Sequence, residues 1–172
     1  MKREILEKIK SHWNAITEIG EFRGQTFLIL HNKEVLKEIV QFLKELNFNH
    51  LQTLTAVDYL NLQEKFRFEV VYQFYSIPLK ISLRIRVKVP EEDPVVDSIV
   101  DLYPAANFLE REVYDLFGIQ FKGHPNLKRI LLPENWAGHP LRKDYPLEPE
   151  EKPEEFIKLK ELKEKLKEHG IN

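Results

Sequence analysis

The sequence predicts an α+β fold, a two-layer sandwich in which helices cover one face of a mixed or antiparallel sheet. An extended C-terminal arm and a terminal helix follow it. Three observations support this prediction. Helical and strand-like apolar patterns alternate along the chain, residues 79–89 alternate strictly between apolar and polar, and prolines crowd the chain beyond Gly123.

The first half of the chain begins with a helical pattern at residues 3–13. Gly24 marks a turn that leads into a short apolar strand. A second helix follows, for which Asn32 is the N-cap and Asn47 a left-handed stop. Its apolar face consists of Val35, Leu36, Ile39, Val40 and Leu43.

Three strands are expected next, at residues 51–60, 65–75 and 79–89, with a hairpin turn at residues 76–78. The third alternates so regularly that it should be half-buried and antiparallel. Its basic face carries Lys80, Arg84, Arg86 and Lys88. This face lacks the stacking aromatics of an RNA-binding sheet, so we expect it to be solvated or covered by a partner.

The second half of the chain divides at Gly123. Before it, Asp93 and Pro94 resemble the start of a short helix that runs to Leu102, and Pro104 could start another that stops at Gly118. The prolines beyond it are at positions 125, 133, 140, 146, 149 and 153. We therefore expect an α+β domain at 1–122, an arm at 123–147, and a linker with a final helix at 148–172. The final helix has a narrow stripe of Phe156, Leu159, Leu162 and Leu166.

Composition excludes several classes of function. The chain has 172 residues, of which 42% are hydrophobic, so it can bury a core, and its net charge of −2 argues against a general nucleic-acid binder. It contains no cysteine and few glycines, which excludes thiolate-ligated clusters and the usual phosphate-binding loops. No apolar run approaches the ~20 residues that cross a bilayer, and no signal peptide is visible, so a soluble cytoplasmic protein is the default.

One charged segment, EREVYDLFG, stands out at residues 110–118. On a helix Glu110 and Glu112 lie about 200° apart, so they cannot act as an acid–base pair on one substrate. Arg111 could bridge to Asp115, four residues on, and Glu112 could face the same way as Asp115. We therefore expect a structural or interface role rather than catalysis.

The sequence Gly-His-Pro occurs twice, around His124 and His139. Together with Glu112 or Asp115, these histidines could be ligands of a metal-dependent hydrolase. Their spacing matches no compact metal-binding pattern, however, and a Gly-X-Pro step is more simply a sharp turn.

The segment LRKDYPL at residues 141–147 has the composition of a docking arm. Tyrosine and arginine are favoured anchors of protein interfaces, and Trp136, Leu141 and Leu147 would otherwise be exposed. We expect this segment to contact another protein.

Residues 106–147 as a whole resemble the signature region of the C subunit of respiratory complex I, the proton-pumping NADH–quinone oxidoreductase. The resemblance rests on ERExxD, FGI, two GHP steps, an Arg-Ile-Leu run and LRKDYP at matching spacings. Family members often have Trp at the position of Phe108 and Met at that of Leu116. The chain looks like the stand-alone form rather than the form fused to the neighbouring D subunit.

The resemblance implies a non-catalytic scaffold subunit of the peripheral arm, at the cytoplasmic face of the cell membrane and attached to it only through the complex. It implies packing on the D subunit, which with the B subunit forms the quinone pocket. FMN, iron–sulfur clusters, NAD and quinone would be bound by other subunits, and this chain would bind no cofactor, metal or nucleic acid. A homologous subunit of a membrane-bound hydrogenase or related dehydrogenase is the alternative. The expected partner-interface residues are Glu110, Arg111, Glu112, Asp115, His124, Arg129, His139, Arg142, Lys143, Asp144 and Tyr145.

Overall fold

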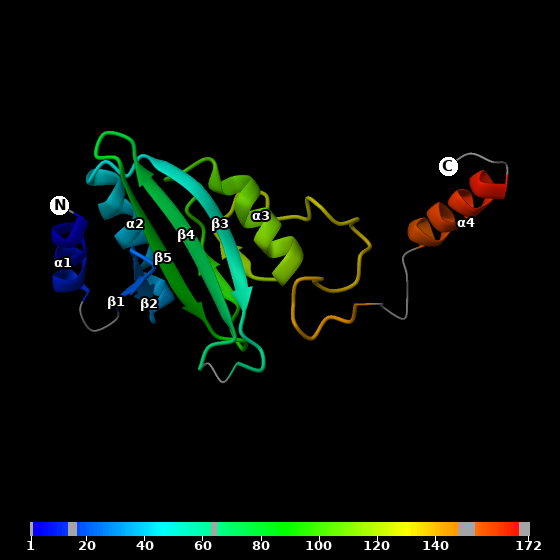
Figure 1. The fold of residues 1–172 in the computed structure, drawn as a ribbon, viewed down its shortest axis with the longest axis horizontal. Helices are drawn as coiled ribbons and strands as arrows, with labels where there is room; N and C mark the ends of the chain where they lie inside the picture. The colour runs from blue at the N-terminus through cyan, green and yellow to red at the C-terminus, as the bar shows by residue number, and fades with distance from the viewer. Residues whose placement is uncertain (1, 14–16, 63–64, 148–153, 169–172) are drawn as a thin grey trace.

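The computed structural model describes residues 2–13, 17–62, 65–147 and 154–168. Figure 1 shows a sheet with helices behind it, an arm to one side, and a last helix beyond the arm. The elements are α1 (Lys2–His12), β1 (Thr17–Phe22), β2 (Gln25–Leu30), a 3-10 turn (Lys33–Val35), α2 (Leu36–Glu45), β3 (His50–Asp58), β4 (Phe68–Ser76), β5 (Ile81–Val89), β6 (Val95–Asp97), α3 (Ala106–Phe117), β7 (Gln120–Lys122) and α4 (Glu154–Glu168).

The main sheet has the strand order β1-β2-β5-β4-β3. The pair β2–β5 is parallel and the other pairs are antiparallel. A small second sheet pairs β6 with β7 in parallel. The predicted α+β fold with a mixed sheet is confirmed.

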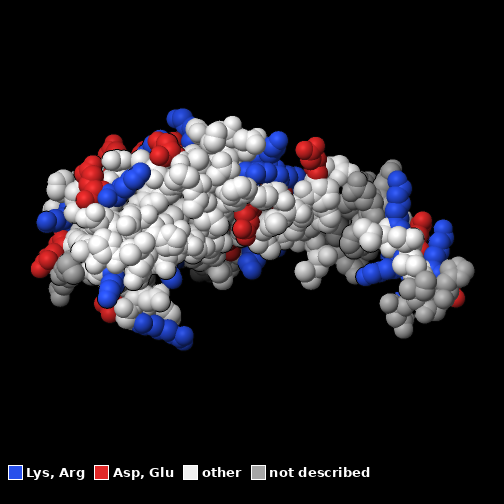
Figure 2. Space-filling model, turned by 90° about the horizontal axis from the view of Figure 1, so that it is seen from above, with Lys and Arg blue, Asp and Glu red and all other residues white. Residues whose placement is uncertain are grey.

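Alternation along β4 and β5 separates a buried face from a polar one. The buried face packs against the apolar sides of α1, α2 and α3. On the other face, Glu69 of β4 pairs with Arg86 at 2.6 Å and with Lys88 at 3.0 Å, and Gln73 accepts from Arg84. Because Glu69 and Lys88 are almost fully buried, the basic stripe is partly neutralised within the sheet. Figure 2 shows that the charges visible from another side are scattered over the surface, with both signs interspersed.

The ends of the helices follow the predicted capping. Asn32 accepts a hydrogen bond from the amide of Glu34 at 3.0 Å, and the helix opens with a 3-10 turn. Asn47 has φ 64° and Gly118 has φ 73°, so both adopt the left-handed conformation that ends a helix.

The predicted helix from Pro94 to Leu102 is wrong. Val95–Asp97 is strand β6 instead, paired with Gln120–Lys122 twenty-five residues later. Two adjacent valines favour a strand, and a partner that is distant in sequence cannot be seen in a local pattern. Strand β1 was also not predicted, since a charged TEIGEF segment has no clear alternation.

Residues 123–147 contain no helix or strand. Beyond them α4 forms as expected, with Leu159, Leu162 and Leu166 exposed. The expected linker at 148–153 lies outside the described residues, as does the side chain of Phe156. Within the described ranges, none of the helices has both the length and the apolar character needed to cross a membrane.

Candidate functional site: the arm that caps helix α3

Helix α3 ends where the arm, residues 123–147, folds back against it. The last carbonyl groups of a helix have no partner within the helix and need donors from elsewhere. The arm supplies them. Asp115 O accepts from His139 Nδ1 at 2.9 Å, Leu116 O from Leu141 N at 3.0 Å, and Phe117 O from Arg142 Nε at 2.6 Å.

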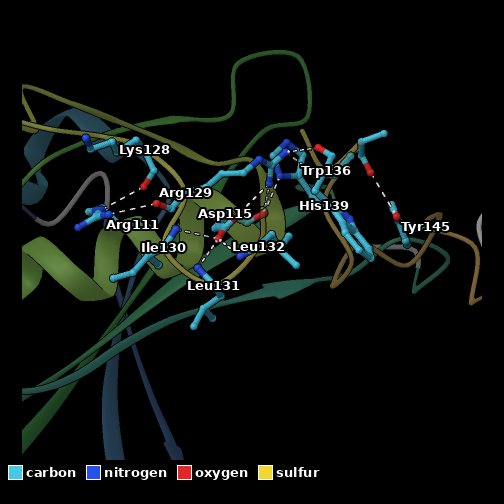
Figure 3. Close-up of polar contacts among 12 residues, drawn as sticks. Arg111, Asp115, Lys128, Arg129, Ile130, Leu131, Leu132, Trp136, His139 and Tyr145 are labelled. Carbon is cyan, nitrogen blue, oxygen red and sulfur yellow. Dashed lines mark hydrogen bonds and ion pairs between the residues drawn. The ribbon is translucent and has the colours of Figure 1, made fainter. Parts of the chain in front are cut away.

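Asp115 is the centre of this contact and is fully buried. Its Oδ2 accepts three successive backbone N–H groups, from Ile130 at 3.0 Å, Leu131 at 2.8 Å and Leu132 at 2.9 Å (Figure 3). Its Oδ1 pairs with Arg129 at 2.6 Å. Burial acts to raise the pKa of Asp115, but these donors outweigh it and hold the pKa below its ordinary value.

Two arginines fix the path of the arm around this carboxylate. Arg129 also donates to the carbonyls of Trp136 and Gly138, both at 3.0 Å. Arg111 donates to the carbonyls of Lys128 at 3.0 Å and Arg129 at 3.1 Å. The expected Arg111–Asp115 bridge is therefore wrong, because Arg129 is the ion-pair partner and Arg111 binds the backbone of the arm.

A second anchor joins the far end of the arm to the sheet. Asp58, at the end of β3, accepts the Lys143 amide at 2.8 Å and two hydrogen bonds from Arg67. Arg67 also pairs with Asp144 at 2.7 Å and with Glu91. Burial acts to raise the pKa of Asp58, but the bonds from Arg67 and Lys143 lower it, and hydrogen bonding to Arg67 lowers the pKa of Asp144.

Glycines allow the arm to approach so closely. A Cβ at Gly118 would lie 2.5 Å from the His139 ring and 2.6 Å from Arg142, and one at Gly138 would lie 2.8 Å from the Tyr145 ring. Both glycines also have positive φ, at 73° and 80°. The second Gly-His-Pro step is thus a turn packed against the end of α3.

Glu110 has a different role on the same helix. It is fully buried, and its two oxygens accept from Ser98 Oγ at 2.6 Å and the Ile99 amide at 2.8 Å. Burial raises the pKa of Glu110 to about 7, although these two bonds act against the shift. Glu110 therefore ties the segment after β6 to α3.

The two histidines do not converge on a common point with the carboxylates. His124 donates from Nε2 to Asn107 O at 3.1 Å, while its Nδ1 accepts from the Asn126 amide. His139 caps Asp115 O, and burial lowers its pKa, helped by the nearby arginines. Glu112 is exposed, whereas Asp115 points inward, so the expectation that they face the same way is wrong.

A metal-dependent hydrolase has no structural support. Across residues 2–13, 17–62, 65–147 and 154–168, no three His, Asp or Glu side chains gather where they could hold a metal ion. His124, His139, Glu112 and Asp115 each have a separate environment.

Several of the predicted interface residues are buried or make contacts within the chain. Glu110 and Asp115 are inaccessible in this chain, and Arg129, His139, Arg142 and the backbone of Lys143 bind within it. Asp58, Arg67 and Ser98 were missed, because their roles depend on partners far along the sequence. A lone acidic residue in the predicted Thr- and Val-rich strand, as Asp58 is, was the available signal.

Large apolar side chains are left on the outside of α3 and the arm. Phe108 is 62% exposed and Leu131 61%, and Leu141 and Leu147 are also exposed. Trp136 is only partly buried, and its buried indole N–H has no hydrogen-bond partner in the structure. Arg129, His139 and Arg142 of the arm bond inward to the end of α3, while these apolar groups face outward.

The sequence matches a known protein family. Residues 29–151 match the family described as "Respiratory-chain NADH dehydrogenase, 30 Kd subunit". The C subunit of the NADH-quinone oxidoreductase of Geobacter sulfurreducens is 49% identical over 82% of this chain and 87% of its own length. NADH-quinone oxidoreductase subunit 5 of Thermus thermophilus is 44% identical over 83% of this chain and 71% of its length.

Two solved structures resemble the chain. The trypsin-resistant fragment (1-134) of Nqo5 is 39% identical with a TM-score of 0.64, covering 72% of this chain and 99% of the fragment. A chain of the membrane-bound sulfane sulfur reductase, an archaeal respiratory membrane complex, has a TM-score of 0.71 over 92% of this chain and 90% of its own. It is only 24% identical, so this second likeness concerns the fold alone. The family match and the curated relatives show that this chain belongs to the family of 30 Kd subunits of the respiratory-chain NADH dehydrogenase.

Proposed function

We propose that the chain is a scaffold subunit in the peripheral arm of a proton-pumping NADH–quinone oxidoreductase. It packs on the D subunit, close to the quinone site that the D and B subunits form. It reaches the cytoplasmic face of the membrane only through the complex, and FMN, iron–sulfur clusters and quinone are held by other subunits. It contributes no catalytic residue and no cofactor ligand.

One observation carries the scaffold role: the most distinctive charged residues are used to hold the chain's own backbone. Asp115 receives three amides and an arginine, and Asp58 receives an arginine and the Lys143 amide. A catalytic carboxylate needs access to a substrate, and both of these are buried. The arrangement presents a fixed surface rather than a reactive group.

The surface that supports docking is the exposed apolar side of α3 and the arm. The guanidinium carbon of Arg111 lies over the Phe108 ring, 5.9 Å from the centre of that ring. Arg111 also donates to the backbone of the arm. Ile130 and Leu131 extend from the backbone that Asp115 fixes (Figure 3). A pre-ordered apolar surface loses little conformational entropy when a partner binds.

The test is purification of the complex from cells that carry a tagged chain, with gentle solubilisation of the membranes. Recovery of D-type and B-type subunits with NADH–quinone activity is the expected result. Recovery with hydrogenase subunits would move the chain to that sister assembly, and a chain recovered alone would contradict the proposal.

Two variants separate assembly from chemistry. Arg142→Ala and Asp144→Ala should each lower the amount of assembled complex while the turnover of each assembled complex stays unchanged, because both residues only hold the arm. Glu134→Ala is the control, since it removes an exposed charge from the same arm. Normal assembly with reduced turnover would contradict the scaffold role.

A further inference from the structure

Strand β1 leaves one edge of the main sheet open. Among the described residues it pairs only with β2, in an unbroken register from Thr17–Leu30 to Phe22–Gln25. The opposite edge strand, β3, is interrupted by a register shift between Leu51 and Thr53. Alternate N–H and C=O groups of β1 therefore point away from the sheet in a regular row.

A hollow lies beside this open edge. It has a volume of about 570 Å³ and is lined by Leu6, Glu7 and Lys10 of α1, by Ile19, Gly20 and Glu21 of β1, and by Thr26 of β2. Figure 1 shows α1 at this end of the molecule, away from the arm. Ile19 is 37% exposed, so an apolar contact is available next to free backbone groups.

A side chain at position 20 would collide with Phe27 unless that ring moved. A Cβ on Gly20 would lie 2.3 Å from the ring of Phe27 on the neighbouring strand. Arg86 lies over that same ring, 4.9 Å from its centre, which ties the position to the polar face of the sheet. The strand thus keeps a gap in its row of side chains at the middle of the open edge.

Charge favours a different partner over a second copy. Directly opposite side chains of an antiparallel strand pair lie on the same face, so two β1 strands related by a two-fold axis centred on Glu18 or on Glu21 would set these like charges against each other. Like charges placed directly opposite destabilise a strand pair. Both glutamates are exposed, so a segment with basic residues at these positions fits better than a second copy.

We propose that β1 accepts an extended segment of another subunit as a sixth strand of the sheet. This inference rests on the proposed membership in a complex. The segment places an apolar side chain in the hollow and basic side chains opposite Glu18 and Glu21. Its backbone satisfies the row of N–H and C=O groups, as in other cases of strand addition.

Hydrogen exchange across residues 17–22 tests the proposal. The outward-pointing amides of β1 exchange rapidly in the isolated full-length chain and slow by at least roughly an order of magnitude in the purified complex. Equal exchange in both states would overturn the proposal. Slow exchange in the isolated chain together with a dimeric mass would make the occupant a second copy, and would overturn it too.

A charge reversal gives an independent readout. Glu21→Lys should reduce recovery of the tagged chain with the complex several-fold, whereas Glu45→Lys, the same change on exposed α2, should not. Both variants should unfold at the same urea concentration as the unmodified chain. If the Glu21→Lys variant enters the complex normally, and the amides of β1 stay unprotected from exchange in that complex, only this inference fails. If the unmodified chain does not enter the complex, the proposed function fails.

Discussion

Helix α3 contains two buried carboxylates five residues apart, and the pKa of one shifts up while that of the other shifts down. Glu110 and Asp115 are both fully buried, so burial alone would raise the pKa of each. Glu110 has two neutral donors and its pKa rises to about 7. Asp115 has three backbone amides and Arg129, and its pKa falls.

The difference shows which part of the chain depends on a negative charge. The arm is built around an ionised Asp115, because only a carboxylate accepts all four donors without leaving Arg129 uncompensated. The segment after β6 needs only hydrogen-bond acceptors from Glu110. Replacement of each acid by its amide should therefore have very different results.

The largest expected effect is that of Asp115→Asn. It leaves Arg129 as a charge without its partner and places an amide group among donors, so the free energy of unfolding should fall by about 3–5 kcal/mol. Urea unfolding at neutral pH measures this loss. Glu112→Gln, the same change at an exposed site on α3, should stay within about 0.5 kcal/mol. A loss for Asp115→Asn as small as that of the control would contradict the account.

Glu110→Gln should change how stability depends on pH. Since the folded pKa of about 7 exceeds the ordinary 4.5, Glu110 stabilises the fold most below 4.5, and this contribution is lost as pH rises through 7. The amide variant should therefore gain stability over the unmodified chain by up to about 3 kcal/mol between these pH values. Asp115 acts in the opposite sense, since its lowered pKa contributes stability that is lost as the solution becomes acidic.

Urea midpoints of the unmodified chain and of Glu110→Gln, measured at a series of pH values from about 4 to about 8, check that prediction. This pH range includes both the ordinary and the folded pKa of Glu110. A constant difference between the two curves across this range would show that Glu110 does not titrate there.

Gly118→Ala should cost more than Gly123→Ala, although both replace a glycine of similar positive φ. The left-handed conformation alone costs about 1–2 kcal/mol for alanine. At Gly123 a Cβ has no neighbour within 4 Å, whereas at Gly118 it would press on His139 and Arg142. The difference between their unfolding free energies isolates the contact of the arm with α3. Equal losses would indicate that the arm does not rest there.

The smallest expected effect is that of Asp144→Ala. Its side chain is half exposed, so the loss should be about 0.5–1 kcal/mol. Glu91→Ala is the matched control for Asp144→Ala, since it removes a similarly exposed partner of Arg67 without touching the arm. Exchange of the Lys143 amide should accelerate in the Asp144 variant only, and acceleration in both would place the effect on Arg67 itself.

Local patterns in the sequence predicted much of the fold, where each residue's role depends on close neighbours. The alternation of β5, the cap at Asn32 and the stops at Asn47 and Gly118 are all of this kind. Pairings distant in the chain could not be predicted, which is why a helix was expected in place of β6: its partner β7 lies beyond α3.

The candidate site was predicted only in part for the same reason. Glu110, Asp115, Arg129 and Arg142 could be identified as residues with a role. That Asp115 binds the backbone of residues 130–132 depends on how the arm folds back, which spacing does not reveal. Contacts of these residues with partner subunits remain a prediction.

The central claim is that the arm is already folded on α3 in the free subunit. Hydrogen exchange of the Ile130, Leu131 and Leu132 amides in the isolated full-length chain tests it most directly. The account predicts slow exchange at all three, lost in Asp115→Asn and kept in Glu110→Gln. Rapid exchange in the isolated chain, with protection only in the assembled complex, would contradict it.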